Sequence, residues 1–212
     1  LIAVLTPFLI FAQLLLTFCK IEPKELLPKA WHVWLLSIQA VSSGIIALLL
    51  IFCPMEEAYR DIFEGAMVCL ICPTATAAAV ITGKLGGSAS TLTTYTLLSN
   101  VLAAIAVPLV FPLVEPHANI TFVVAFLKIL SKVFPLLLAP FFIALLFRYY
   151  IPSVHRLLSK YHGVAFYLWA VALTIVTGQT VRSLVTAAAD VSIEIMIALA
   201  GLATCCLQFY FG

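Results

Sequence analysis

Charged residues are scarce in this chain, and their scarcity limits the class of protein it can form. They make up 9% of the 212 residues, whereas hydrophobic residues make up 64%. An ordinary soluble domain carries about 25% charged residues. Since a membrane-spanning helix needs about 20 mostly apolar residues, the composition predicts an all-α, polytopic transmembrane bundle surrounded by lipid. The net charge of only +2 argues against a nucleic-acid partner.

Side chains that could support catalysis or hold a metal are also scarce within the apolar segments. No Asp, Glu or His falls near the centre of any of them, and the six cysteines show no zinc-type spacing. We therefore expect no catalytic residue, no cofactor and no metal, except for Na+ as a candidate coupling ion. A membrane enzyme is the least favoured class, because the sequence offers no acid/base pair and no nucleophile with a partner.

Seven apolar segments follow one another and predict about seven membrane spans in a single integral membrane domain, residues 1–212. They cover residues 1–18, 30–52, 62–85, 88–114, 120–147, 163–184 and 193–211. The fifth segment is long for one crossing. We interpret residues 120–132 as an interfacial stretch whose Lys128 and Lys132 reach water, so that the span proper starts near Val133.

The positive charges of the loops predict an orientation. The first, third and fifth loops between the predicted spans together carry seven positive charges: Lys20, Lys24, Lys29, Lys84, Arg148, Arg156 and Lys160. The second, fourth and sixth loops together carry two: Arg60 and Arg182. By the positive-inside rule, loops 20–29, 84–87 and 148–162 face the cytoplasm. We expect the bacterial inner (plasma) membrane as the location, and the sequence does not indicate an oligomeric state.

Pro73 lies in the middle of the third apolar segment and predicts a broken helix there. Proline removes a backbone donor and clashes with the preceding turn. Backbone groups freed at membrane depth must find partners in the protein or in a wet cavity. Broken helices lined by small hydroxyl residues form the substrate or ion sites of many secondary transporters, so this segment is the first candidate site.

Buried polar residues cluster around this break and in the next segment. Thr74 and Thr76 flank the break, and with Asn100 they are our candidate substrate-binding residues. Gln39, a large amide in an otherwise apolar span, must face protein or water. A hydrogen bond between helices and a role in an ion site are equally good explanations for its presence there. For single Ser and Thr residues, bonding back to the helix or tight helix packing is the ordinary role.

The segment from Glu64 to Pro116 resembles the bile acid:sodium symporter family, whose fourth helix carries a Cys-Pro-Gly-Gly-Thr-Ala-Ser-Asn break. Cys72, Pro73, Thr76 and Ala77 match that pattern, whereas Thr74 and Ala75 replace the two glycines and Ala78 and Ala79 replace the Ser-Asn pair. By this resemblance, Gln39, Thr91 and Thr96 are sodium-binding candidates: Gln39 and Thr96 fall on sodium-ligating positions, and Thr91 lies beside one that Leu92 occupies.

The resemblance implies a ten-helix fold of two inverted repeats, with panel-like helices in residues 1–29 and 120–185 and core-like helices in residues 30–116 and 189–212. On this mapping residues before Leu1 and after Gly212 belong to the natural protein. It implies a secondary transporter that moves a small organic anion, bile-acid-like or a carboxylate, by alternating access coupled to an ion. An auxin-efflux-type or arsenite-type carrier stays open as an alternative. A transport-incompetent sensor or interaction subunit also stays open, and the alanines at 78 and 79 favour it.

Overall fold

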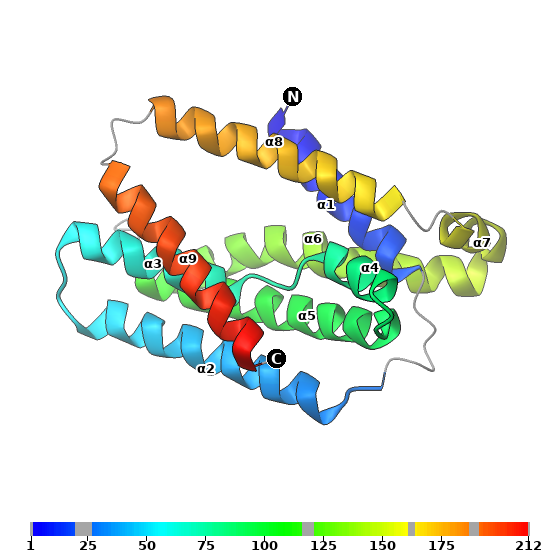
Figure 1. The fold of residues 1–212 in the computed structure, drawn as a ribbon, viewed down its shortest axis with the longest axis horizontal. Coiled ribbons are helices and arrows are strands. Elements are labelled where there is room, and N and C mark those ends of the chain that lie inside the picture. Colours follow the sequence, from blue (N-terminus) through cyan, green and yellow to red (C-terminus); the bar gives the residue numbers. More distant parts are fainter. Residues whose placement is uncertain (1, 20–26, 116–120, 161–163, 187–190, 212) are drawn as a thin grey trace. The chain divides into compact units, whose positions relative to one another are not determined.

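A computed structural model describes residues 2–19, 27–115, 121–160, 164–186 and 191–211, and every regular element in these ranges is a helix (Figure 1). The helices are α1 (Ile2–Phe18), α2 (Ala30–Phe52), α3 (Glu57–Ile71), α4 (Thr76–Lys84), α5 (Ala89–Val114), α6 (Phe122–Tyr150), α7 (Pro152–Lys160), α8 (Val164–Thr186) and α9 (Val191–Phe211). Among the described residues, α2, α5, α6 and α8 are long and apolar enough to cross a membrane, and α1 and α9 contain shorter apolar stretches. The predicted polytopic helical membrane fold is confirmed.

The third apolar segment is divided at Pro73, as the sequence predicts. α3 ends at Ile71 and α4 begins at Thr76. Proline alone does not explain the interruption, because α1, α5 and α6 contain prolines in their interiors and continue through them: Pro7, Pro108, Pro112, Pro135 and Pro140. What distinguishes the break at Pro73 is how its freed backbone groups are bonded, as described below.

The fifth apolar segment and the loop after it form two helices. α6 is continuous from Phe122, and Lys128 and Lys132 are exposed on it. The interfacial interpretation of residues 120–132 thus falls on the first turns of one long helix, with residue 120 outside the described part of the chain. α7, within the predicted loop, was not foreseen from the sequence; Pro152 begins it, at a position where the missing N–H costs nothing.

Contacts within the chain divide it into two compact units, each with its own core. The first unit comprises residues 1–28, 73–104 and 132–182, and the second comprises residues 29–72, 105–131 and 183–212. The division falls inside α5, α6 and α8. The grouping into panel-like and core-like helices, which rests on the family resemblance, stays a prediction.

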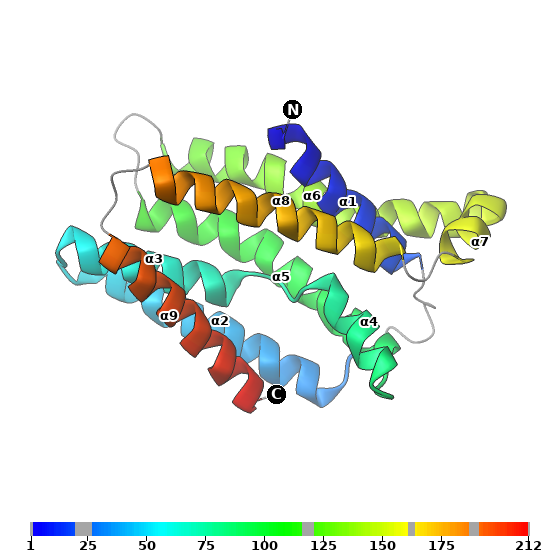
Figure 2. The ribbon, with the colours of Figure 1, turned by 45° about the horizontal axis from the view of Figure 1, so that its top comes forward.

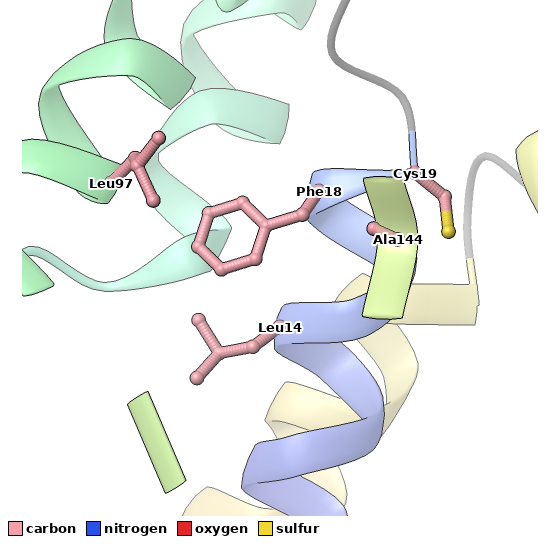
Figure 3. Packing of buried hydrophobic residues seen from close by; sticks show 5 residues of the cluster. All are labelled: Leu14, Phe18, Cys19, Leu97 and Ala144. Atoms are coloured by element: carbon pink, nitrogen blue, oxygen red, sulfur yellow. The ribbon is translucent and has the colours of Figure 1, made fainter. Parts of the chain in front are cut away.

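The core of the first unit joins α1 to α5 and α6. Leu14 and Phe18 of α1 pack with Leu97 of α5 and Ala144 of α6 (Figure 3). The rings of Phe18 and Phe141 meet edge to face with centroids 5.7 Å apart, a favoured geometry for aromatic pairs. This cluster fixes α1 against the part of α5 that carries the polar residues predicted to form the site.

The second unit is built around α3, which lies beside both α2 and α9 in two views (Figures 1 and 2). In the buried core of this unit, Met67 and Ile71 of α3 pack with Leu50 of α2. α9 approaches α3 closely at a glycine: a Cβ on Gly65 would lie 2.8 Å from Cγ2 of Ile197. Small residues permit this close approach of helices in membranes.

Candidate functional site

The backbone between α3 and α4 leaves the helical conformation at Cys72 and returns to it at Thr76. Cys72 has φ −54° and ψ 132°, and Ala75 has φ −61° and ψ 134°. Proline disfavours the helical conformation of the residue before it, which accounts for Cys72. The end of α3 and the start of α4 belong to the second and first unit respectively, so each end is described within its own unit.

The C-terminal end of α3 is capped by the side chain of Gln39. Its Nε2 donates hydrogen bonds to the carbonyl oxygens of Ile71 at 3.1 Å and Cys72 at 3.3 Å. Both acceptors are carbonyls, which fixes the amide orientation, because only the nitrogen can donate. Gln39 is buried on α2, and with both amide protons directed at α3 only its Oε1 is left to accept a bond. The predicted sodium ligand thus has a structural role at the break.

The backbone that leads into α4 is held by α5 within the first unit. The backbone N–H of Thr74 donates to the Ser99 hydroxyl oxygen at 3.0 Å, and the side chains of Thr74 and Tyr95 are hydrogen-bonded to each other. Tyr95 and Ser99 are four residues apart and therefore share one face of α5. Sequence reasoning did not single out either residue, although that spacing within a hydroxyl-rich helix was visible.

Most hydroxyls of α5 are bonded to their own helix. Thr93 and Thr96 donate to carbonyl oxygens four residues earlier, at 2.7 and 3.0 Å, and Thr91 donates to that of Ser88 at 3.1 Å. This is the ordinary role of hydroxyls in membrane helices. Thr91 and Thr96 are five residues apart, about 140° around the helix at 3.6 residues per turn. Thr96 is fully buried and Thr91 is half-buried.

The remaining predicted site residues also fall in the first unit. Asn100 is buried on α5, and its Nδ2 has no hydrogen-bond partner among the described residues. Thr76 begins α4, but its side chain lies outside what the structure describes. Ala77 and Ala79 are buried, so α4 supplies methyl groups at these two positions, whereas a cation would need oxygen ligands.

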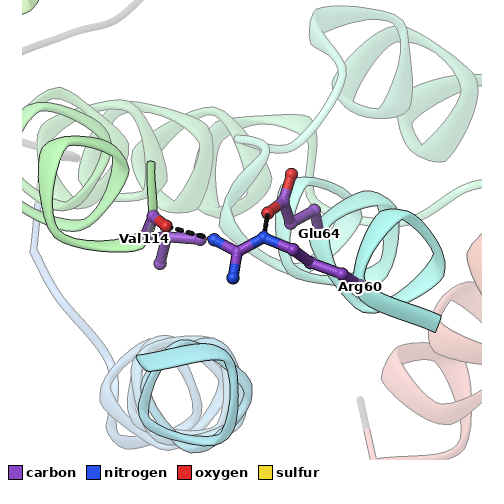
Figure 4. Close-up of polar contacts among 3 residues, drawn as sticks. All are labelled: Arg60, Glu64 and Val114. Atoms are coloured by element: carbon purple, nitrogen blue, oxygen red, sulfur yellow. Dashed lines mark hydrogen bonds and ion pairs between the residues drawn. The ribbon is translucent and has the colours of Figure 1, made fainter. Parts of the chain in front are cut away.

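The other end of α3 carries an ion pair in the second unit. Arg60 Nε lies 2.9 Å from Glu64 Oε1, and the same guanidinium donates to the carbonyl oxygen of Val114 at the end of α5 (Figure 4). Cations near a helix C-terminus bond its last carbonyls and complement the helix dipole. Arg60 therefore ties the start of α3 to the end of α5 and has a structural role away from the break.

α7 is held at the end of α1 in the first unit. The Ser159 hydroxyl donates to the carbonyl oxygen of Cys19 at 3.0 Å. His155 also bonds to the Cys19 backbone; burial, and secondarily the charge of Arg148, lower the pKa of its imidazole below the usual 6.5. These contacts position α7 and bring no catalytic pair together.

The fold and the broken helix define a polytopic helical membrane protein with a polar break in one helix, a class that includes many secondary transporters. Residues 6–187 match the model of the Sodium Bile acid symporter family. The chain belongs to that family, a family of symporters rather than enzymes. No curated protein and no solved structure matches the chain significantly.

Proposed function

We propose that this protein is a secondary transporter that carries a small organic anion by alternating access, with its substrate site at the start of α4 and on α5. The observation that carries the proposal is the break at Pro73, whose backbone ends are bonded by side chains from other helices. A break maintained in this way is a built feature of the fold. The Ala78 N–H bonds the carbonyl oxygen of Ala75 at 3.0 Å, but the N–H groups at the very start of a helix have no intrahelical acceptor. The positive end of a helix also favours an anionic group.

Thr74, Thr76 and Asn100 are the residues that we assign to the substrate. Thr74 lies in the break itself, and its backbone and side chain are positioned by Ser99 and Tyr95. Asn100 lies one turn beyond Tyr95 and Thr96 on the same helix, and its Nδ2 donor has no partner among the residues that the structure describes. Within one unit, these residues supply amide and hydroxyl groups, which can bind a carboxylate without the cost of burying a counter-charge.

The test is uptake of a labelled bile acid, and of smaller carboxylates, by the full protein in proteoliposomes. We expect Thr74→Ala combined with Thr76→Ala to reduce uptake at least tenfold. Thr180→Val is the matched control, because Thr180 is exposed on α8 and its hydroxyl bonds the Val176 carbonyl oxygen of the same helix. Unchanged uptake in the double variant would reject the assignment of the site.

Sodium is the candidate coupling ion, with Thr91 and Thr96 as candidate ligands in the first unit and Gln39 as a candidate ligand of a separate site in the second unit. Ala78 and Ala79 weigh against a full site on α4, because alanine has no side-chain oxygen. An ion that binds only the folded protein raises the thermal stability of that protein. If Tm rises with NaCl and not with KCl, sodium coupling is supported. If the two salts give equal Tm values, proton coupling or uniport is favoured instead.

The second candidate is a sensor or interaction subunit that keeps the transporter fold, and the alanines at 78 and 79 favour it. An anion that stabilises the protein without being taken up would identify this function. An auxin-efflux-type or arsenite-type substrate would appear in the same uptake assay. We place the protein in the bacterial inner membrane with loops 20–29, 84–87 and 148–162 in the cytoplasm, an orientation that cysteine labelling from either side can test.

A further inference from the structure

The short helix α7 has two faces, one held against the protein and one exposed. On the inner face, Ser159 and His155 bond to the backbone of Cys19. Leu158 of the same face packs against the core of the first unit. The outer face consists of exposed residues three or four positions apart: Ser153, Arg156, Leu157 and Lys160. This spacing is that of one stripe along a helix, so α7 presents these four side chains together on its outer surface.

α7 lies along one surface of the membrane. Only Ile151 separates its first residue from α6, which ends at Tyr150. Ser159, in its last turn, is held at Cys19, the residue that follows α1. A helix of this length extends for about 13 Å, and α7 uses it to reach from the end of α6 to the end of α1 (Figure 1). Because both of its ends are fixed at helix ends, α7 runs along the surface at which α6 leaves the membrane.

Large side chains that favour a membrane interface are exposed at this corner. The exposed fraction is 70% for Tyr149 and 80% for Tyr150 at the end of α6, and 55% for Leu157 on the outer face of α7. Tyrosine is enriched where membrane helices meet the headgroups. An interfacial amphipathic helix buries its apolar residues between the headgroups and the acyl chains. The corner between α6 and α7 therefore has the side chains of a segment embedded in the interface.

The charge of this corner is positive. Arg148 lies in the last turn of α6, and Arg156 and Lys160 lie on the outer face of α7. The described residues of the first unit include no Asp or Glu. The loop after α1 lies outside them and carries equal numbers of carboxylates and lysines: Glu22, Glu25, Lys20 and Lys24. A phosphate group that approaches α7 therefore meets an excess of positive charge, and Arg and Lys are the side chains suited to binding it.

We propose that the outer face of α7 and the end of α6 bind the headgroup of an anionic phospholipid. Arg156 and Lys160 contact the phosphate, and Leu157 lies among the upper parts of the acyl chains. A lipid fits better than a soluble anion, because the exposed tyrosines and Leu157 offer apolar surface beside the charges. It also fits better than an acidic protein, because the surface lies at the level at which α6 leaves the membrane. This binding site does not depend on the proposed transport of an anion.

The experiment titrates the full protein in detergent micelles with dioctanoyl phosphatidylglycerol, an anionic lipid, and with dioctanoyl phosphatidylcholine, a neutral one. Native mass spectrometry counts the bound lipids and gives their affinities. Each Lys or Arg near an anionic surface contributes about fivefold to binding, so we expect a preference of roughly tenfold or more for the anionic lipid. Arg156→Gln with Lys160→Gln should reduce this preference to below about threefold, and high salt, about 0.5 M NaCl, should reduce it in the wild type.

The matched control removes another pair of cations with the same spacing. Lys128 and Lys132 are exposed and four residues apart on α6, so Lys128→Gln with Lys132→Gln changes the net charge by the same amount as the α7 variant. We expect this control to retain the preference. Equal losses in the two double variants would assign the effect to net charge and overturn the site. Because Arg156 and Lys160 are exposed, the α7 variant should also keep the Tm of the lipid-free protein.

The remaining outcomes identify other partners of this surface. If glycerol phosphate, which has no acyl chains, binds as tightly as phosphatidylglycerol, the surface binds a soluble anion and the proposal is overturned. Tighter binding of hexaglutamate than of the lipid would assign the surface to an acidic protein and overturn it as well. Equal affinities for the two lipids, or a preference that high salt leaves unchanged, would also reject it. None of these measurements involves uptake, so a failure of the transport proposal leaves this inference standing.

Discussion

Replacing Gln39 with methionine should destabilise the protein, because the amide caps the end of α3. Gln39→Met keeps the length and nearly the volume of the side chain, so it creates no cavity. It removes the hydrogen bonds from Nε2 to the carbonyl oxygens of Ile71 and Cys72. In a continuous helix those carbonyls would accept from the N–H groups of Ala75 and Thr76, but the backbone leaves the helical conformation between Cys72 and Ala75, so the two carbonyls need another donor.

The expected loss of unfolding free energy is about 1 to 4 kcal/mol. Hydrogen bonds between membrane helices average about 0.6 kcal/mol in double-mutant cycles, so two bonds give roughly 1.2 kcal/mol as the lower value. A buried acceptor left without a partner costs about 1–3 kcal/mol. We apply the cost of an unpaired buried acceptor only to the Ile71 carbonyl, whose hydrogen bond is buried. For the Cys72 carbonyl, whose bond is longer and partly buried, we use the average of about 0.6 kcal/mol. Their sum gives the upper value.

Reversible unfolding in mixed detergent micelles measures this difference. Ser37→Ala is the matched control, because Ser37 is an exposed residue on α2 whose hydroxyl bonds the Val33 carbonyl oxygen at 2.7 Å. We expect the control to stay within about 0.5 kcal/mol of the wild type. A Gln39→Met variant equally close to the wild type would show that other groups satisfy the carbonyls, and would refute the capping role.

Three further variants test other contacts. Ser99→Ala should remove the acceptor of the Thr74 N–H and cost about 1–3 kcal/mol in an unfolding titration, together with a decrease in anion uptake; full stability would contradict the contact. Gly65→Val should force Ile197 to move and lower the stability by roughly 1–3 kcal/mol, the usual cost of overpacking, whereas Gly65→Ala should cost less. Burial lowers the pKa of His155, so its neutral form stabilises the fold above about pH 6.5, and this contribution is lost as the pH falls. His155→Gln should therefore reduce the decrease in Tm between pH 7 and pH 5.

The sequence alone predicted α2, α5, α6 and α8 well because each of them is long and apolar. α2 begins and ends at the predicted residues, Ala30 and Phe52, and α5 differs from its prediction by one residue at its start. Hydrocarbon leaves the backbone few alternatives to a helix, so composition suffices to place most of them. α7 was missed because its nine residues mix polar and apolar side chains and lie in a segment that carries several charges, which is typical of a loop.

The candidate site was only partly predictable, because the chemistry of a residue type does not say which partner it meets. The sequence indicated that Gln39 must face a polar group, but it could not say that this group is the end of α3. The family resemblance placed Thr96 on a sodium-ligating position and Thr91 beside one, but it could not say that Thr96 is fully buried and Thr91 half-buried. Gln13 of α1 is also buried, which the sequence did not indicate, since its burial depends on packing between helices that are distant in the sequence.

The prolines of this chain show why a helix break needs more than proline. α6 passes through Pro135 and Pro140 without interruption, as membrane helices can when local adjustments satisfy the freed backbone. At Pro73 the freed groups are met instead by side chains, with Gln39 donating to the end of α3 and Ser99 accepting from the Thr74 N–H. These partners stabilise the open conformation over a kink. A chain with Gln39→Met and Ser99→Ala together should therefore shift toward a continuous kinked helix and lose anion uptake even if it stays folded. Amide hydrogen exchange would detect the change, because exchange across the break should be slower in the variant.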